Sequence, residues 1–246
     1  MPKKDEATEH REDYSRFVVH LTRDDTADFE NGSSARTNLI SIMKSRCILA
    51  TGSHNIYNKQ IENLSEDIKE NCKVSCFTEV PLSQLHLLTQ EIPGRKIKLE
   101  EYGLVFRKQL LIDTGAQPVI YVNSYNNNQW LREAAKELFD IAKKDLESPF
   151  WRMIPFMNAM HEKYDFSWER EWRVKGDFKY KSKDLVAVIL PKKSEIKFRK
   201  ILVSAGVACI SPSWRYEQIV DELAKQQRTT KSLKLDKRVE PKTKKA

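Results

Sequence analysis

Residues 168–174 read Trp-Glu-Arg-Glu-Trp-Arg-Val, a stretch that combines the alternation of a strand with a dense set of charges. Successive side chains of a β-strand point to opposite faces, so a strand here places Glu169, Glu171 and Arg173 on one face. The two tryptophans share the other face with Arg170. We therefore expect the tryptophans to pack into a core and the opposite face to carry the charges.

The rest of the chain alternates between short apolar runs and amphipathic stretches. Runs typical of strands occur at residues 17–22, 48–49, 74–78, 102–106, 117–122, 185–190 and 201–204. Helices are predicted after Ser33 and Ser34 and at residues 82–90, 128–146, 149–160 and 212–225. The polar residues 52–72 are predicted to form a long loop. Strands at both ends with helices between them indicate an α+β fold.

The chain divides into three parts by composition. Residues 1–16 are a polar lead-in, and residues 17–224 have the apolar periodicity of one mixed α+β domain. Residues 225–246 carry nine Lys and Arg against two acidic residues, which is most of the net charge of +8. Such a tail can bind nucleic acid in a salt-dependent way, or it can be a solvated end that aids solubility.

Several classes of protein are excluded by the sequence. The longest uncharged stretch, residues 114–131, is rich in Asn and Gln and is shorter than the about 20 apolar residues that a membrane span needs. The polar start of the chain lacks the apolar region of a secretory signal. The 4 cysteines are few for 246 residues, which favours a reducing compartment. We expect a cytoplasmic protein without a membrane partner.

The two glutamates of residues 168–174 are the first candidates for chemistry. Two carboxylates two residues apart on one strand raise each other's pKa unless a cation lies beside them. Glu169 and Glu171 could thus stabilise a developing positive charge, such as the oxocarbenium ion of N-glycosidic cleavage. The alternative is a charge ladder in which Arg170 and Arg173 pair with the glutamates.

His20 lies inside the apolar run at residues 17–22 and is the second candidate. On a strand, His20 and Thr22 face the same way, and both can hydrogen-bond a ribose or a phosphate. The alternative is a histidine that is buried and satisfied in the core. His54 is expected to be solvated.

Metal and phosphate-loop chemistry find no support in the sequence. Cys72 and Cys76 are four residues apart, with no second pair of Cys or His at ligand spacing, so we expect no metal site. The glycine motifs of nucleotide-binding loops and of the nucleophile elbow do not occur among the 7 glycines.

Four blocks, in the same order, resemble the AbiGi-type family of abortive-infection proteins, which resist phage. They are VSCFTEVPLS at residues 74–83, YGLVFRK at 102–108, GAQPVIYV at 115–122 and FSWEREWR at 166–173. The resemblance spans roughly residues 17–205 and leaves the basic tail outside. It implies bacterial anti-phage defence, in which the family is labelled as the antitoxin of a toxin–antitoxin pair.

The layout is also similar to that of ADP-ribosyltransferase-like proteins, which implies two small sheets around a cleft that takes NAD. Carried over by position, His20 would hold a ribose, and Tyr102 or Phe77 would stack on nicotinamide. Glu171 would bond the ribose 2′-hydroxyl and stabilise the oxocarbenium ion, and Glu169 would orient the acceptor. The tryptophans that flank the glutamates depart from the usual transferase motif.

Two functions follow from these patterns. The first is an enzyme that cleaves the nicotinamide–ribose bond of NAD and transfers ADP-ribose to a macromolecular acceptor, without a metal. For this enzyme we expect Glu171→Gln to abolish activity at nearly unchanged stability. The second is a non-enzymatic antitoxin or regulatory partner, in which residues 168–173 form a structural strand.

Overall fold

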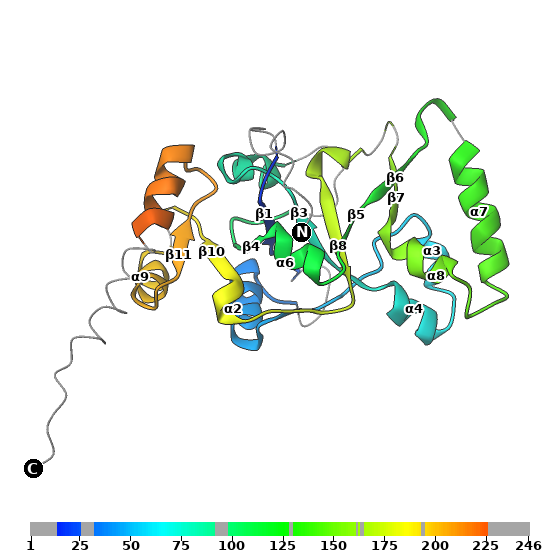
Figure 1. Cartoon of the computed structure of the whole chain (residues 1–246), viewed down its shortest axis with the longest axis horizontal. Coiled ribbons are helices and arrows are strands. Elements are labelled where there is room, and N and C mark those ends of the chain that lie inside the picture. The colour runs from blue at the N-terminus through cyan, green and yellow to red at the C-terminus, as the bar shows by residue number, and fades with distance from the viewer. Residues whose placement is uncertain are drawn as a thin grey trace, which may run out of the picture.

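The computed structural model describes residues 14–25, 32–91, 98–127, 130–160, 162, 165–192 and 195–225 (Figure 1). These residues form one seven-stranded sheet, two two-stranded sheets and several helices, so the expected α+β class is confirmed. The basic tail beyond residue 225 and most of the polar lead-in lie outside the described residues.

The seven-stranded sheet has the order β11-β10-β4-β1-β3-β8-β5. Its strands are β1 (Phe17–Leu21), β3 (Val74–Thr78), β4 (Gly103–Arg107), β5 (Gln117–Pro118), β8 (Glu171–Lys175), β10 (Leu185–Ile189) and β11 (Ala208–Ile210). All neighbours pair antiparallel except β10 and β11, which are parallel. The two-stranded sheets are β2 (Cys47–Ile48) with β9 (Phe178–Lys179), and β6 (Ile120–Asn123) with β7 (Met157–Met160).

Helices lie around these sheets (Figure 1). In the described residues they are α2 (Ala35–Ser45), α3 (Asn58–Ile61), α4 (Glu66–Cys72), α5 (Leu85–Leu88), α6 (Lys108–Asp113), α7 (Trp130–Ala142), α8 (Phe150–Met153) and α9 (Ile196–Ser204), with a further helix at residues 216–225. Helix α2 begins where predicted, because the Ser34 side chain accepts a hydrogen bond from the Thr37 backbone N–H.

Alternation along the strands builds a core on each face of the main sheet. Val18 of β1 packs in a cluster with Leu39 of α2 and with the aromatic rings of β3, β4 and β9. Val19, the next residue, packs on the other face with Leu85 of α5 and Ile219. Because both faces are covered, the strands of the centre of the sheet are apolar on both sides.

A third core forms a smaller lobe beside the main sheet. Tyr57, Phe139 and Trp151 pack there between α3, α4, α7, α8 and strand β6. Figure 1 shows this lobe at the end of the molecule that carries α7, opposite β11 and α9. Strand β5 leads directly into β6, so the chain passes from the sheet into the lobe at Val119.

Two segments differ in type from the sequence prediction. Residues 52–72 contain α3 and α4 rather than a long loop, because Ile61, Ile68 and Cys72 are spaced to bury one side of each short helix. Residues 201–204 belong to helix α9, which buries Leu202 and exposes Ile201. The expected edge strand comes later, at β11, after Gly206 turns the chain with a φ of 78°.

Other segments differ in extent. The apolar run 117–122 divides into β5 and β6, which pair in different sheets, and residues 149–160 end in strand β7 rather than continuing as a helix. Beside the two small sheets, the structure has one main sheet of seven strands. Strand β4 pairs with both β1 and β10, which joins the strands of both ends of the chain in one main sheet.

None of the described helices is both long enough and apolar enough to cross a membrane.

Candidate functional site

The main sheet is irregular between β1 and β3. These strands share one register pair, Val19 with Thr78, whereas β3 and β8 pair over five residues and end with Thr78 opposite Glu171. Val19, Thr78 and Glu171 thus form one row across three neighbouring strands, spanning about 10 Å. Beyond this row β1 and β3 separate, and backbone groups at the gap need other partners.

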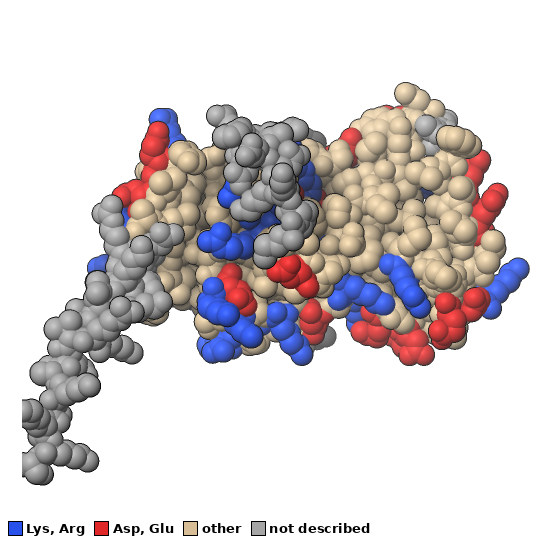
Figure 2. Space-filling view, viewed as in Figure 1, with Lys and Arg blue, Asp and Glu red and all other residues tan. Residues whose placement is uncertain are grey.

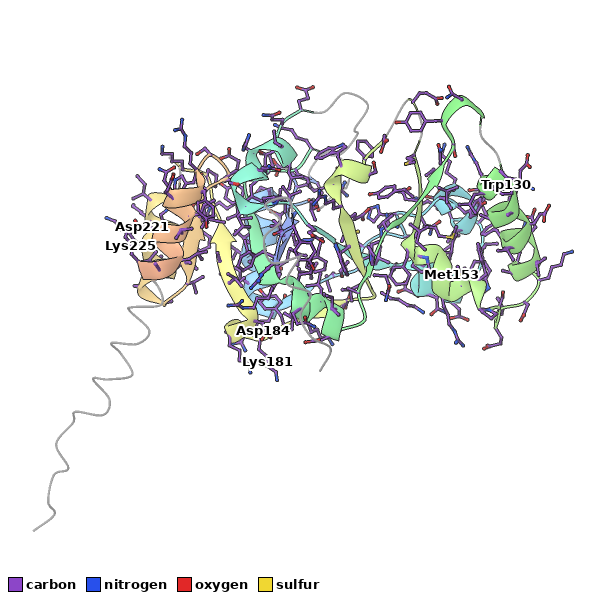
Figure 3. The ribbon with its side chains drawn as sticks, turned by 45° about the horizontal axis from the view of Figure 1, so that its top comes forward. Trp130, Met153, Lys181, Asp184, Asp221 and Lys225 are labelled. Carbon is purple, nitrogen blue, oxygen red and sulfur yellow. The ribbon has the colours of Figure 1, made fainter. Side chains whose placement is uncertain are left out.

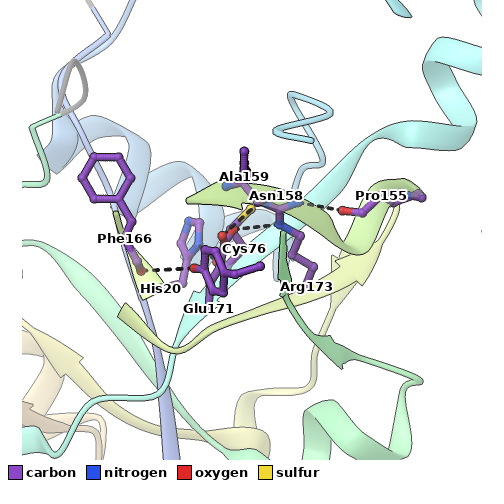
Figure 4. A network of polar contacts seen from close by, with 9 residues as sticks. His20, Cys76, Pro155, Asn158, Ala159, Phe166, Glu171 and Arg173 are labelled. Carbon is purple, nitrogen blue, oxygen red and sulfur yellow. Dashed lines mark hydrogen bonds and ion pairs between the residues drawn. The ribbon is translucent and has the colours of Figure 1, made fainter. Parts of the chain in front are cut away.

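His20 fills this gap (Figure 4). Its Nδ1 lies 2.9 Å from the carbonyl oxygen of Cys76 in β3. A carbonyl only accepts, so Nδ1 carries the proton and Nε2 of the neutral ring is an acceptor. Burial lowers the pKa of His20, which keeps the ring neutral. Nδ1 of His20 is therefore hydrogen-bonded within the protein, and Nε2 is an acceptor.

Glu171 is held in place by a buried arginine on its own strand. Arg173 Nε and Nη2 donate to the two carboxylate oxygens of Glu171 at 2.9 and 3.0 Å. Nη1 donates to the carbonyl oxygen of Pro155 at 2.8 Å, which connects the sheet to the smaller lobe (Figure 4). The Arg173 side chain is 1% exposed and that of Glu171 14% exposed. The carboxylate is thus oriented from one side and reachable from the other.

Weakly acidic groups surround the Glu171 carboxylate. Burial, followed by the charge of Glu171, raises the pKa of the Cys76 thiol well above its ordinary value. The same causes raise the pKa of Tyr121, whose hydroxyl donates to the carbonyl oxygen of Phe166 at 3.1 Å. Cys76 is therefore a thiol rather than a nucleophilic thiolate.

Glu169 is not on the strand that the sequence predicted. It lies in a short 3-10 turn, Ser167–Glu169, and Arg170 then adopts a left-handed conformation with a φ of 47°. The strand begins only at Glu171, so the two glutamates do not share a strand face. The charge of Glu169 nevertheless acts on the pKa of Cys76 and of Tyr121, which places both carboxylates beside one region.

The tryptophans are separated as well. Trp168 is exposed in the turn, contrary to the expected packing into the core. Trp172 is half-buried on β8, and its Nε1 donates to Glu79 at 2.8 Å. The prediction was wrong for Trp168 because the turn interrupts the alternation that a strand would impose.

Three further predicted ligand contacts serve the packing of the fold. The Thr22 hydroxyl is buried and donates to the carbonyl oxygen of Ala35 at 2.8 Å. Phe77 is buried, with its ring centroid 5.0 Å from that of Phe178. The Tyr102 hydroxyl donates to Glu195 at 3.0 Å. Strand alternation explains why Phe77 is buried: it points to the face opposite Cys76, where the aromatic core lies.

A buried ion pair that sequence reasoning missed lies next to β8. Lys108 Nζ is 2.9 Å from Glu79, both side chains are buried, and the same ammonium group lies 3.4 Å from the ring centroid of Tyr14. The Glu79 carboxylate also borders a pocket of about 120 Å³ beside Trp168 and Arg170. Nothing in the spacing of Glu79 and Lys108 along the chain indicates this pairing.

Among the described residues, no group of three or more His, Cys, Asp or Glu could hold a metal ion.

Comparison with models of protein families, with curated proteins and with solved structures finds no match to this chain. The function is therefore inferred from the site.

The Glu171–Arg173 pair changes the stability expected of the substitution Glu171→Gln. A neutral amide would leave the buried guanidinium without its counter-charge, and breaking a buried pair in this way costs about 3 kcal/mol. We expect Glu171→Gln to lower the free energy of unfolding by that amount in urea titrations followed by circular dichroism. Adding Arg173→Met should restore most of it, and a single variant as stable as the parent would contradict the pairing.

The lowered pKa of His20 predicts a pH dependence of stability. The unfolded chain takes up a proton near the ordinary histidine pKa of 6.5, and the folded chain does so only at lower pH. The stabilisation is thus complete above pH 6.5 and is lost as the pH falls below it, at up to about 1.4 kcal/mol per pH unit. The free energy of unfolding, measured by urea titration between pH 7.5 and 5, should fall less steeply with decreasing pH in His20→Asn than in the parent. A His20→Asn protein whose stability changes with pH as steeply as that of the parent would contradict this role of His20.

Proposed function

We propose that the chain is an ADP-ribosyltransferase-like enzyme that cleaves the nicotinamide–ribose bond of NAD. The observation that carries this proposal is the neighbourhood of β1, β3 and β8 in the main sheet, with His20 bonded to Cys76 of β3 and Glu171 opposite Thr78 of the same strand. An early strand with a ribose-binding histidine and a late strand with the catalytic glutamate are what the resemblance implies.

The two side chains are suited to hold the ribose of NAD. Nε2 of the neutral His20 accepts a hydrogen bond, which a ribose hydroxyl donates. Glu171 accepts from the ribose 2′-hydroxyl, and the two hydrogen bonds from Arg173 hold its carboxylate in place. A fixed negative charge beside the ribose stabilises the oxocarbenium ion that develops as the bond breaks.

Cleavage of the nicotinamide–ribose bond requires little of the site beyond the negative charge of Glu171. The bond between ribose C1 and the nicotinamide nitrogen breaks, and its electron pair leaves with nicotinamide as a neutral ring. No acid is needed for that departure, which fits a site where the neighbouring thiol and phenol have raised pKa values. A nucleophile from water or from a macromolecular acceptor, oriented by Glu169, then bonds to C1.

The biological setting is proposed from the four sequence blocks. Their resemblance to abortive-infection proteins supports a role in bacterial anti-phage defence, exerted in the cytoplasm on a macromolecular acceptor.

Incubation with NAD labelled in its adenylate part tests the enzyme directly. We expect the parent to release nicotinamide and to label one class of macromolecule in a cell extract. Glu171→Gln and the double variant Glu171→Gln with Arg173→Met should both lose at least about 100-fold in rate, because the carboxylate itself is required.

Glu195→Gln is a matched control for this assay. It removes the charge of another buried glutamate, which lies at the start of α9 and pairs with Arg36 of α2 at 2.7 Å. Nicotinamide release that persists in this variant separates the chemistry from a general loss of stability. A folded parent that releases no nicotinamide would refute the proposed activity.

A second function, as a regulatory partner, is favoured by the outer face of α7. Leu131, Leu138 and Ile141 follow one side of this helix and are exposed, Leu138 at 49% and Ile141 at 64%. Trp130 is 87% exposed at the start of the helix and points away from the lobe (Figure 3). Contiguous apolar surface of this kind marks protein–protein contacts. Figure 2 shows the charges of the lobe gathered along its lower and outer edge.

Growth of cells that express the chain alone distinguishes the two functions. The enzyme should slow growth, and Glu171→Gln should relieve the effect. A regulatory partner should be harmless and should suppress the toxicity of the protein encoded beside it. In that case Leu138→Lys with Ile141→Lys should abolish the suppression, since charges on α7 cannot be buried in an interface, and both exposed sites should leave the thermal midpoint unchanged.

A further inference from the structure

The short sheet of β2 and β9 brings two basic segments of the chain together. Its register pairs Cys47 with Lys179. Just beyond the ladder, the backbone N–H of Tyr180 donates to the carbonyl oxygen of Arg46 at 3.1 Å. The sheet therefore places two segments side by side that are far apart in the chain, residues 44–50 and 177–184.

These two segments contain more cations than anions. Their only acidic residues are Asp177 and Asp184. Tyr180 is buried, so alternation along the extended chain turns the side chains on either side of it outward. The cations of the two segments are all exposed, and they are Lys44, Arg46, Lys179, Lys181 and Lys183.

None of these five cations forms an ion pair with the described residues. Both aspartates of the segments are bonded to the backbone instead. Asp177 accepts from the N–H of Ala50 at 2.8 Å, and Asp184 accepts from the backbone N–H of Lys181 at 2.8 Å. Since most of the net charge lies in the tail, the domain is nearly neutral, and the five cations are a local excess.

The excess lies on an accessible edge of the molecule. Figure 2 shows Lys and Arg side chains gathered around α2 at the lower edge, with acidic side chains among them. Figure 3 labels Lys181 and Asp184 at the same edge. A rigid sheet and the end of a helix thus present the cations together to solvent.

The chemistry of this edge does not suit a protein or a membrane. The centres of protein–protein interfaces are depleted in Lys and rich in aromatic residues. Membrane-surface helices bury an apolar face in the lipid, whereas the apolar side of α2, with Leu39 and Ile42, packs in the core of the domain. In the two segments, which the structure describes in full, Leu49 is the only large apolar side chain that is exposed.

Nucleic acid is the partner that matches such a surface. Its backbone carries closely and evenly spaced phosphates, and Lys and Arg that neutralise them release bound counterions. Protein surfaces that bind nucleic acid are accordingly much more positively charged than those that bind proteins. An exposed aromatic ring, on which unpaired bases could stack, is not present in the two segments, because Phe178 and Tyr180 are buried.

We propose that the surface formed by Lys44, Arg46, Lys179, Lys181 and Lys183, the β2–β9 surface, binds the phosphate backbone of a nucleic acid without selecting its sequence. This is a binding function beyond the proposed enzyme, and it is separate from any contribution of the basic tail. It requires no NAD, so it stands or falls independently of the chemistry at Glu171.

Fluorescence anisotropy of labelled nucleic acid tests the proposal. The full chain is titrated, without NAD, into a duplex DNA and into a single-stranded RNA of mixed sequence at several salt concentrations between about 50 and 200 mM. We expect the parent to bind with an affinity that falls steeply as salt rises. The triple variant Lys179→Gln, Lys181→Gln and Lys183→Gln should lower the slope of log affinity against log salt by about 2.7 on the duplex, because each phosphate contact contributes about 0.9. Its affinity at the lowest salt should fall by at least about 100-fold.

The smaller lobe offers a matched control. Lys59→Gln, Lys144→Gln and Arg152→Gln remove the same charge from exposed residues of that lobe, which likewise form no ion pair with the described residues. This control variant should keep most of the parental slope. Both triple variants should keep the parental thermal midpoint, since every changed side chain is exposed.

The other outcomes would overturn the β2–β9 surface. A parental slope in the Lys179, Lys181 and Lys183 variant would assign the binding to the basic tail. An equal loss in the control variant would show a response to net charge alone. A parent that binds neither nucleic acid at the lowest salt, or that binds only vesicles containing phosphatidylglycerol, would exclude nucleic acid as the partner. Nicotinamide release by the same proteins is measured separately and decides only the enzyme.

Discussion

The buried guanidinium of Arg173 is the interaction on which the site depends. A charge this far from solvent is tolerated only with a counter-charge and hydrogen-bond acceptors around it. Glu171 supplies the counter-charge in a two-point contact, and the carbonyl oxygen of Pro155 in the smaller lobe accepts a third hydrogen bond. The need to satisfy the Arg173 guanidinium therefore fixes the direction of the Glu171 carboxylate and the position of the smaller lobe against the sheet.

The gap between β1 and β3 is the second constraint, and it complements the first. Strands that separate leave backbone carbonyls without ladder partners, and the His20 ring supplies one for Cys76. The same bond fixes the tautomer, so the other nitrogen of the ring is an acceptor. One side chain thus both bonds a backbone carbonyl of the sheet and keeps an acceptor for a ligand. This explains why His20 fits both interpretations of the sequence.

Most strands could be predicted from the sequence because their burial is local. Residues 17–22 and 74–78 are apolar on both faces, and only strands at the centre of a covered sheet need that pattern. The loop predicted at 52–72 was wrong because two short helices bury only a few residues each, a signal too weak beside many polar ones. The strand predicted at 201–204 was wrong because a continuous apolar run fits a helix as well as a strand.

The site could be predicted only in part, for a related reason. Glu171 and His20 lie in strands, where alternation and order along the chain are informative. The turn that removes Glu169 from the strand depends on the left-handed φ of Arg170, which no residue type at that position announces. The pairing of Glu79 with Lys108 joins different segments of the chain, and a single sequence carries no record of such a contact.

The side-chain hydrogen bonds that join β8 to its neighbours are compatible with a catalytic role for one of its residues. Trp172 reaches Glu79 on one side and Arg173 reaches Pro155 on the other, as a purely structural strand would require. Yet the exposure along these contacts is uneven. Arg173, Glu79 and Lys108 are buried, whereas Glu171 keeps part of its carboxylate accessible. A carboxylate that is rigid on one side and open on the other is what electrostatic stabilisation of a bound cation needs.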